Sequence, residues 1–177
     1  MKIGLISLGC PKNLVDSEVM LGLAREAGHE FTRDAAGADV LVVNTCAFID
    51  SAKQESIDAI LEMARHKTDG ACQRLIVTGC LAERYRDELV REIPEIDAVL
   101  GTGEVPEIVR AINGAGAQPV ASPLVFHRAS VRDQPPAPSP QPPTYIYDAS
   151  TPRVLATPRH YAYIKVAEGC DYKCAFC

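Results

Sequence analysis

Short apolar runs alternate with amphipathic stretches over the first 113 residues of the chain. The apolar runs have the length and composition of buried strands, and the clearest cover residues 3–8, 40–43, 75–77 and 98–100. After each run, hydrophobic residues recur at helical spacing, which predicts helices over residues 13–27, 50–66, 81–93 and 105–112. This alternation predicts an α/β domain with a mostly parallel sheet flanked by helices.

The composition changes after this domain. Ten of the thirteen prolines lie between Pro119 and Pro158, and proline lacks the N–H that helices and sheets need. We therefore predict an N-terminal domain, a proline-rich linker and the incomplete start of a second domain, at residues 1–113, 114–158 and 159–177. The second domain would open with a strand at residues 161–166. A lone strand has no sheet to pair with, so we expect this last unit to be poorly ordered by itself.

The composition of the chain fits an ordinary globular protein. Of its 177 residues 47% are hydrophobic, and the mean hydropathy is close to zero. No apolar run is long enough to cross a bilayer, and the N-terminus lacks the layout of a signal peptide. Seven cysteines without an export signal favour reduced thiols and metal binding over disulfides. We expect a cytoplasmic protein with no membrane contact.

The net charge of −5 is unevenly distributed. Residues 1–113 carry 12 Lys and Arg against 19 Asp and Glu, whereas residues 114–177 carry 6 against 4. Binding of nucleic acid depends mainly on Lys and Arg at the phosphates. The acidic first domain therefore argues against nucleic acid as a partner of these residues.

The last residues carry three cysteines, Cys170, Cys174 and Cys177, spaced C-x-x-x-C-x-x-C. Three cysteines can hold three corners of a cubane iron–sulfur cluster and leave the fourth iron open to a small molecule, whereas four cysteines leave no free site. A structural zinc site would need a fourth ligand, and no residue follows Cys177 to supply it. The spacing therefore favours a cluster with one open iron.

Three further cysteines, Cys10, Cys46 and Cys80, each follow a predicted strand and precede a predicted helix. The carboxyl ends of parallel strands lie at one edge of the sheet, where α/β proteins bind ligands. Helix N-termini at that edge favour thiolates and anionic clusters. The pattern predicts a shared metal site, and a second three-cysteine cluster fits it better than zinc. The alternative is three separate cysteines buried in the core.

Several other residues near this edge allow more than one interpretation. A zinc ion here would need a histidine as fourth ligand, but the candidates lie near helix ends or in the linker: His29, His66 and His127. Cys72 precedes its strand, so we interpret it as a thiol outside the site. Asn44 and Thr45 would either hydrogen-bond cluster sulfurs or shape a turn. Four polar residues would either cap the first helix or line the cluster pocket: Asn13, Asp16, Ser17 and Glu18.

The C-x-x-x-C-x-x-C spacing resembles that of radical S-adenosylmethionine (SAM) enzymes. With a second three-cysteine set on an α/β domain, the chain resembles the methylthiotransferases, radical-SAM enzymes that insert a methylthio group at an unactivated C–H bond. Its sequence further resembles the branch called RimO, which modifies an aspartate of a small-subunit ribosomal protein at the decoding centre. The segments that carry this resemblance are residues 9–18 (Gly-Cys-Pro-Lys-Asn-Leu-Val-Asp-Ser-Glu), 44–52 and 160–170.

The resemblance implies that the first cysteine set holds an auxiliary 4Fe–4S cluster and the second a radical-generating 4Fe–4S cluster. It implies that SAM both methylates sulfur and yields a 5′-deoxyadenosyl radical that takes hydrogen from the β-carbon of the aspartate. The implied partners are the ribosomal protein and an electron donor such as flavodoxin or ferredoxin. The family's catalytic barrel and C-terminal β-domain would follow Cys177, so we expect this chain to be inactive alone.

Two other functions stay open at this point. The transfer-RNA branch of the family, MiaB, modifies an adenosine and typically has Gly-Cys-Gln-Met-Asn where this chain has Gly-Cys-Pro-Lys-Asn. The chain could also be a non-catalytic iron–sulfur binding module, whose clusters would be saturated with ligands and would not respond to SAM.

Overall fold

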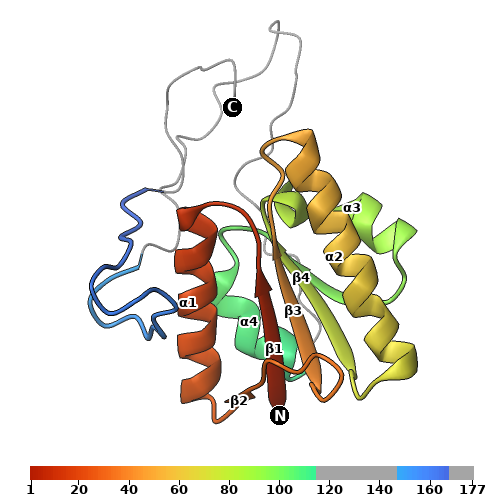
Figure 1. Cartoon of the computed structure of the whole chain (residues 1–177), viewed down its shortest axis with the longest axis horizontal. Coiled ribbons are helices and arrows are strands. Elements are labelled where there is room, and N and C mark those ends of the chain that lie inside the picture. The colour runs from red at the N-terminus through yellow and green to blue at the C-terminus, as the bar shows by residue number, and fades with distance from the viewer. Residues whose placement is uncertain (115–146, 168–177) are drawn as a thin grey trace, which may run out of the picture.

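A computed structural model of the chain describes residues 1–114 and 147–167 (Figure 1). Most of the predicted linker and the three cysteines of the C-terminal motif lie outside these residues. The described elements, in chain order, are β1 (Lys2–Ser7), α1 (Pro11–Glu26), β2 (Glu30–Phe31), β3 (Val40–Thr45), α2 (Asp50–Asp69), β4 (Arg74–Gly79), α3 (Cys80–Glu92), β5 (Ile96–Leu100), the 3-10 turn η1 (Val105–Glu107) and α4 (Ile108–Ile112).

The strands form one parallel five-stranded sheet in the order β2-β1-β3-β4-β5. The predicted α/β domain with a mostly parallel sheet is confirmed. Because the chain passes from β2 across β1 to β3, the strand order reverses direction between β1 and β3. In doubly wound sheets this switch point opens a crevice outside the carboxyl ends of the strands.

Helices cover both faces of the sheet, α1 and α4 on one side and α2 and α3 on the other (Figure 1). Side chains of a strand alternate between its two faces, so β3 supplies both layers. Val40 and Val42 pack with α1 and α4, whereas Leu41 and Val43 pack with α2 and α3. Burial on both faces explains why the central strands are continuous apolar runs.

The sequence pattern missed β2, which has only two residues at the edge of the sheet. The predicted strand at residues 161–166 is wrong, because these residues take no regular secondary structure. A strand needs a neighbour for its backbone hydrogen bonds, and an apolar run does not reveal whether one exists. Residues 147–167 instead run beside α1 (Figure 1). Within residues 159–167, Lys165 contacts Asp16 of α1, while the expected poor order of residues 159–177 stays a prediction.

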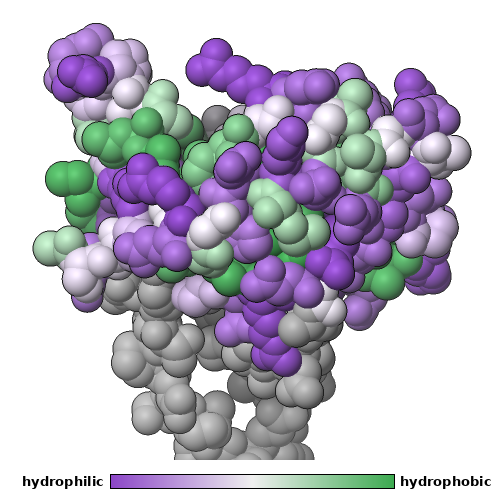
Figure 2. Space-filling model, turned by 90° about the horizontal axis from the view of Figure 1, so that it is seen from below, coloured by the Kyte–Doolittle hydropathy of each residue, from purple (hydrophilic) through white to green (hydrophobic). Residues whose placement is uncertain are grey.

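Within residues 1–114 and 147–167, no helix has the length and apolar character needed to span a membrane. The face seen from below in Figure 2 carries mostly hydrophilic residues, with smaller hydrophobic areas between them.

The α2 helix offers a direct test of the layer arrangement. Ile60 lies on the side of α2 that packs in the core and is fully buried. Ile60→Ala should therefore lower the free energy of unfolding by about 2–5 kcal/mol. Its neighbour Leu61 is 46% exposed, and Leu61→Ala should change this free energy by less than about 1 kcal/mol. Urea unfolding followed by circular dichroism measures both values. Equal losses would show that α2 faces the sheet with a different side.

Candidate metal centre

Three cysteines lie at the carboxyl ends of three neighbouring strands. Cys10 follows β1, Cys46 follows β3, and Cys80 begins α3 directly after β4. Because β1, β3 and β4 are adjacent in the sheet, all three cysteines lie at the same edge, and the first two flank the switch point. Cys46 is buried, Cys80 is half-buried and Cys10 is exposed, so the site opens to solvent beside Cys10.

Two of these cysteines follow a glycine with a positive φ. Gly9 and Gly79 both have φ of +94°, which an L side chain rarely adopts. A Cβ on Gly9 would lie 2.8 Å from Cys46 Cβ and 3.0 Å from Cys46 Sγ, and a Cβ on Gly79 would lie 2.5 Å from the Thr45 carbonyl oxygen. Both glycines are therefore required for the turns that bring Cys10 and Cys80 close to the end of β3.

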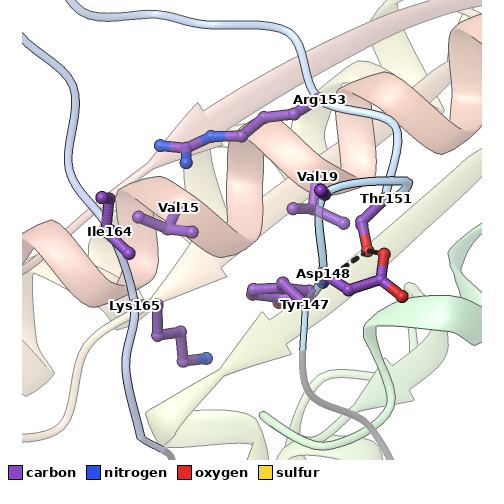
Figure 3. Close-up of a pocket in the computed structure, with 9 residues that line it drawn as sticks. Val15, Val19, Tyr147, Asp148, Thr151, Arg153, Ile164 and Lys165 are labelled. Atoms are coloured by element: carbon purple, nitrogen blue, oxygen red, sulfur yellow. Dashed lines mark hydrogen bonds between the residues drawn. The ribbon is translucent and has the colours of Figure 1, made fainter.

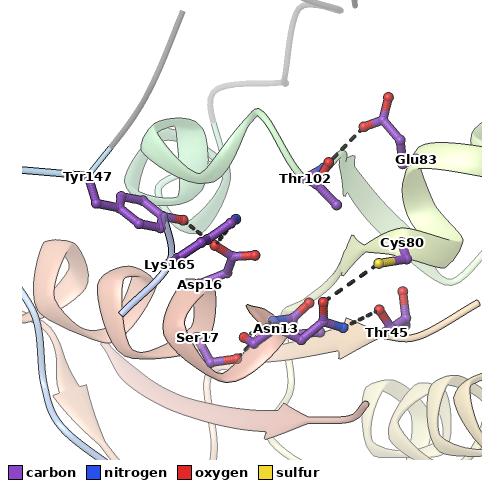
Figure 4. Close-up of polar contacts among 10 residues, drawn as sticks. Asn13, Asp16, Ser17, Thr45, Cys80, Glu83, Thr102, Tyr147 and Lys165 are labelled. Atoms are coloured by element: carbon purple, nitrogen blue, oxygen red, sulfur yellow. Dashed lines mark hydrogen bonds and ion pairs between the residues drawn. The ribbon is translucent and has the colours of Figure 1, made fainter. Parts of the chain in front are cut away.

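The side chain of Asn13 joins the ends of the three strands (Figure 4). Its amide nitrogen donates to the carbonyl oxygens of Leu8 and Thr45, at 3.0 and 2.8 Å. The Cys80 thiol donates to its amide oxygen at 3.6 Å. Asn13 lies in the first turn of α1 and is buried. One side chain thus connects the loop before α1, the end of β3 and the start of α3.

Ser56, on α2, fixes the backbone of Cys46. The serine hydroxyl donates to the Cys46 carbonyl at 2.9 Å and accepts from the Cys46 N–H at 3.0 Å. The sequence does not reveal this role of Ser56, because its only signal is a serine on the apolar side of an amphipathic helix. From α3, the Arg84 guanidinium donates to the Ala47 carbonyl at 3.0 Å. Both backbone partners of the Cys46 loop therefore come from helices.

Asn44 and Thr45 make hydrogen bonds to α1 and to β4, and their bonding to cluster sulfurs stays a prediction. The Asn44 amide donates to the Asn13 carbonyl and to the Ser17 hydroxyl, at 2.8 and 2.9 Å. Ser17 donates in turn to Ser7 of β1 at 2.8 Å. The Thr45 hydroxyl donates to a carbonyl of β4 at 2.6 Å. These side chains hold the edge of the sheet together.

The predicted capping role of Asn13 and its neighbours is wrong. The helix begins at Pro11, two residues before the predicted start, with Cys10 at the N-cap position and no side-chain cap. Asp16, Ser17 and Glu18 therefore lie beyond the first turn, where no backbone N–H is left unpaired. Asp16 and Glu18 are instead buried against residues 147–165.

The Cys80 thiol is influenced by burial and by the other two cysteines. Burial raises the pKa of the Cys80 thiol above its ordinary value, and the nearby Cys46 and Cys10 sulfurs raise it further. Arg84 acts in the opposite direction on the same pKa. Metal ligation requires thiolates, so the thiols would release their protons on binding a cation. The N-termini of α1 and α3 point backbone N–H groups toward this edge and favour the negative charge that results.

Within the part of the chain that the structure describes, no three His, Cys, Asp or Glu side chains already surround a point suited to a single metal ion. A cubane cluster does not need such a point, because each cysteine binds a different iron at a different corner. A mononuclear zinc site would need four ligands around one centre. Three thiols at neighbouring strand ends match three corners of a cubane cluster, whereas a zinc ion would need a fourth ligand.

The remaining candidate ligands lie away from this edge. Cys72 precedes β4 at the opposite edge of the sheet, where its thiol donates to the Arg74 carbonyl at 3.2 Å and burial raises its pKa. His29 follows α1, and His66 lies in the last turns of α2. The structure thus brings Cys10, Cys46 and Cys80 together without Cys72 or these two histidines. His127 lies outside the described residues, as do Cys170, Cys174 and Cys177.

A comparison with protein families identifies the domain that carries these cysteines. The model of the family described as uncharacterized protein family UPF0004 matches residues 2–101, from β1 to the residue after β5. The chain belongs to this family. The matched UPF0004 domain contains the whole sheet and all three cysteines of the candidate site.

Curated relatives match the chain beyond the UPF0004 domain. Three of them are named ribosomal protein uS12 methylthiotransferase RimO. The protein from Koribacter versatilis is 50% identical over 205 residues, which cover 99% of this chain and 40% of the relative. Those from Solibacter usitatus and Pelotomaculum thermopropionicum are 54% and 51% identical, and cover 100% of this chain but 34% and 36% of their own lengths. The chain thus spans between a third and two fifths of these relatives.

Asn13→Ala should destabilise the UPF0004 domain. The substitution leaves the buried carbonyls of Leu8 and Thr45 without their donor, which should lower the free energy of unfolding by about 1–3 kcal/mol. Asn113→Ala is the matched control, because Asn113 is exposed after α4. Urea unfolding measures both. If the two variants were equally stable, the bridge between strand ends would contribute nothing to folding.

Proposed function

We propose that Cys10, Cys46 and Cys80 hold an auxiliary 4Fe–4S cluster, and that the chain is part of a radical-SAM methylthiotransferase that modifies an aspartate of ribosomal protein uS12. The gathering of three cysteines at the switch point of the sheet carries the first part of this proposal. The names of relatives that match the chain along its length support the second part. In this proposal the C-terminal cysteines hold a second 4Fe–4S cluster that binds SAM.

Each element at the edge has a role in this proposal. The three thiolates would bind three irons and leave the fourth iron without a protein ligand. Cys10, which is exposed, lies on the side of the site that solvent reaches. When bound, the two clusters and SAM supply the electron, the radical and the methylthio group. The chain supplies position: Gly9 and Gly79 allow close backbone approach, and Asn13 and Ser56 fix the loops. Burial of Cys46 keeps water from one side of the cluster.

The surroundings of the site fit a substrate that arrives from outside. Phe48 and Ile49 follow Cys46 and are 59% and 54% exposed. Exposed apolar side chains beside an open metal site provide a surface that another protein or domain can cover. We expect the uS12 protein or the rest of the enzyme to cover it. The four described cysteines are free thiols, which fits a cytoplasmic enzyme supplied by an electron donor such as flavodoxin or ferredoxin.

The ligand assignment can be tested with cysteine variants of the 177-residue chain. To isolate the auxiliary site, Cys170, Cys174 and Cys177 are changed to serine in every variant. Adding Cys10→Ser, Cys46→Ser or Cys80→Ser should abolish cluster binding, because each removes one of three thiolates. Cys72→Ser is the matched control and should keep the cluster. Anaerobic reconstitution followed by iron and sulfide determination and visible absorbance provides the measurement.

Retention of the cluster in the Cys80→Ser variant, together with its loss in the Cys72→Ser variant, would reject this ligand set. A change in the absorbance or electron paramagnetic resonance spectrum on adding SAM to the chain with all cysteines present would support a cluster with an open iron. An unchanged spectrum would favour a saturated electron-transfer module.

The substrate can be tested with a longer protein that contains this chain and has the full length of the curated relatives. Incubated with SAM, a reductant and a peptide of uS12, it should add one methylthio group to an aspartate. The corresponding Asp→Asn peptide is the matched control and should stay unmodified. Mass spectrometry with fragmentation locates the group. Modification of transfer RNA in place of the peptide would move the assignment to the other branch of the family.

A further inference from the structure

Residues 147–167, called the strap here, hold α1 through the buried carboxylate of Glu18. This side chain is fully buried in the middle of α1. It accepts from Arg153 Nε at 2.7 Å and from the Ala156 N–H at 2.6 Å. The Val154 N–H donates to the Glu18 backbone carbonyl at 2.9 Å. Glu18 thus binds three residues of the strap: Arg153, Val154 and Ala156.

A second buried carboxylate on α1 binds the far end of the strap (Figure 4). Asp16 pairs with the Lys165 ammonium at 2.6 Å, and their side chains are only 6% and 4% exposed. The Tyr147 hydroxyl also donates to Asp16, and the Lys165 ammonium lies 5.2 Å from the centre of the Tyr147 ring. Asp16 therefore binds the first and last parts of the strap to α1, the helix that follows Cys10.

Gly22 gives independent evidence that α1 is shaped for the strap. It lies inside the helix, where glycine is among the least favourable residues. A Cβ at this position would collide with the Pro152 carbonyl group and would lie 2.5 Å from the Arg153 nitrogen. The absence of a side chain lets the strap backbone lie directly on the helix. Glycine here is explained by this contact, since a helix in isolation would favour alanine.

Apolar side chains fill the contact between the strap and α1 only in part, through Tyr147, which packs against the core layer that α1 shares. A cavity of about 280 Å³ remains between them, with Val15 and Val19 on the helix side and Ile164 on the strap side (Figure 3). Polar pairs therefore define how the strap docks. Removing one partner of a buried pair leaves the other charge uncompensated, so each pair favours one position of the strap strongly.

We propose that Asp16, Glu18 and Gly22 are positioning residues that dock the strap on α1 and so fix the approach to the second cysteine motif. This proposal rests on the proposed function, because it gives the strap its role between the two cysteine sets. Cys170 is five residues after Lys165. Five residues of extended chain span at most about 18 Å. Docking of Lys165 on the helix that follows Cys10 therefore limits the distance between the two cysteine sets.

Gly22→Ala tests the docking in the metal-free 177-residue chain. The added Cβ should displace the strap while favouring the helix itself, so amide exchange at Val154 and Ala156 should become about tenfold faster or more, while α1 stays protected. Gly103→Ala is the matched control, because a Cβ on Gly103 would meet no atom within 4 Å. Hydrogen exchange resolved by NMR provides the measurement. Unchanged exchange at both amides would overturn the docking.

Variants of the ion pairs give a second, independent measurement. Lys165→Met and Arg153→Met should accelerate exchange at the same two amides, because each leaves a buried carboxylate unpaired. The controls Lys53→Met and Arg91→Met alter pairs at exposed carboxylates and should leave this exchange unchanged. Equal exchange in the two groups would overturn the role of the buried pairs. Since no metal is present, failure of the proposed cluster would not alter these results.

The positioning role has its own readout. In the metal-free chain, a flexible bismaleimide should cross-link Cys10 to the cysteines of the second motif, and mass spectrometry measures the yield. Gly22→Ala should lower this yield several-fold, and Gly103→Ala should not. If exchange at Val154 increased but the cross-link yield stayed the same, the strap would dock on α1 without limiting the distance between the cysteine sets.

Discussion

The side-chain amide of Asn13 is the contact on which the candidate site depends. Its two donors pair with carbonyls from the loop after β1 and from the end of β3, and its oxygen accepts from Cys80. A buried amide of this kind is favourable only when its partners are present together. Asn13 therefore requires the ends of β1, β3 and β4 to stand at fixed positions. Those ends carry the three cysteines, so the contact that stabilises the edge also spaces the thiols.

Polar burial in the described residues is concentrated where the chemistry is proposed. Six of the eight polar residues buried within residues 1–114 and 147–167 lie at the carboxyl edge or beside it: Asn13, Ser17, Asn44, Thr45, Ser56 and Thr78. The other two, Asp16 and Glu18, are buried against the strap. The two layers of the core are apolar and provide most of the stability. Desolvated polar groups are unfavourable unless paired. Their concentration at one edge marks it as the part of the fold shaped for more than packing.

Local patterns predicted much of this structure, because strands and amphipathic helices leave periodic signals. The rule that parallel strands end at one edge was enough to place Cys10, Cys46 and Cys80 together. Partners distant in sequence leave no such signal. Asp16 and Glu18 resembled capping residues, but their charges are bound by residues more than a hundred positions later. The apolar run at 161–166 resembled a strand for a similar reason, because the sequence does not show whether a neighbouring strand is present to pair with it.

Because the strap docks on α1, the folded unit consists of two segments that are separated in the sequence, residues 1–114 and residues 147–167. Ile112 ends α4 within the core layer next to α1, and Tyr147 re-enters against the same layer. Both ends of the intervening stretch are therefore anchored on one folded unit, and the stretch closes a loop between fixed points. The entropy of closing such a loop rises only slowly with length, by about 0.6 kcal/mol for each doubling. Evolution is therefore free to lengthen, shorten or rewrite the proline-rich stretch while the strap and the cysteine edge keep their relative positions.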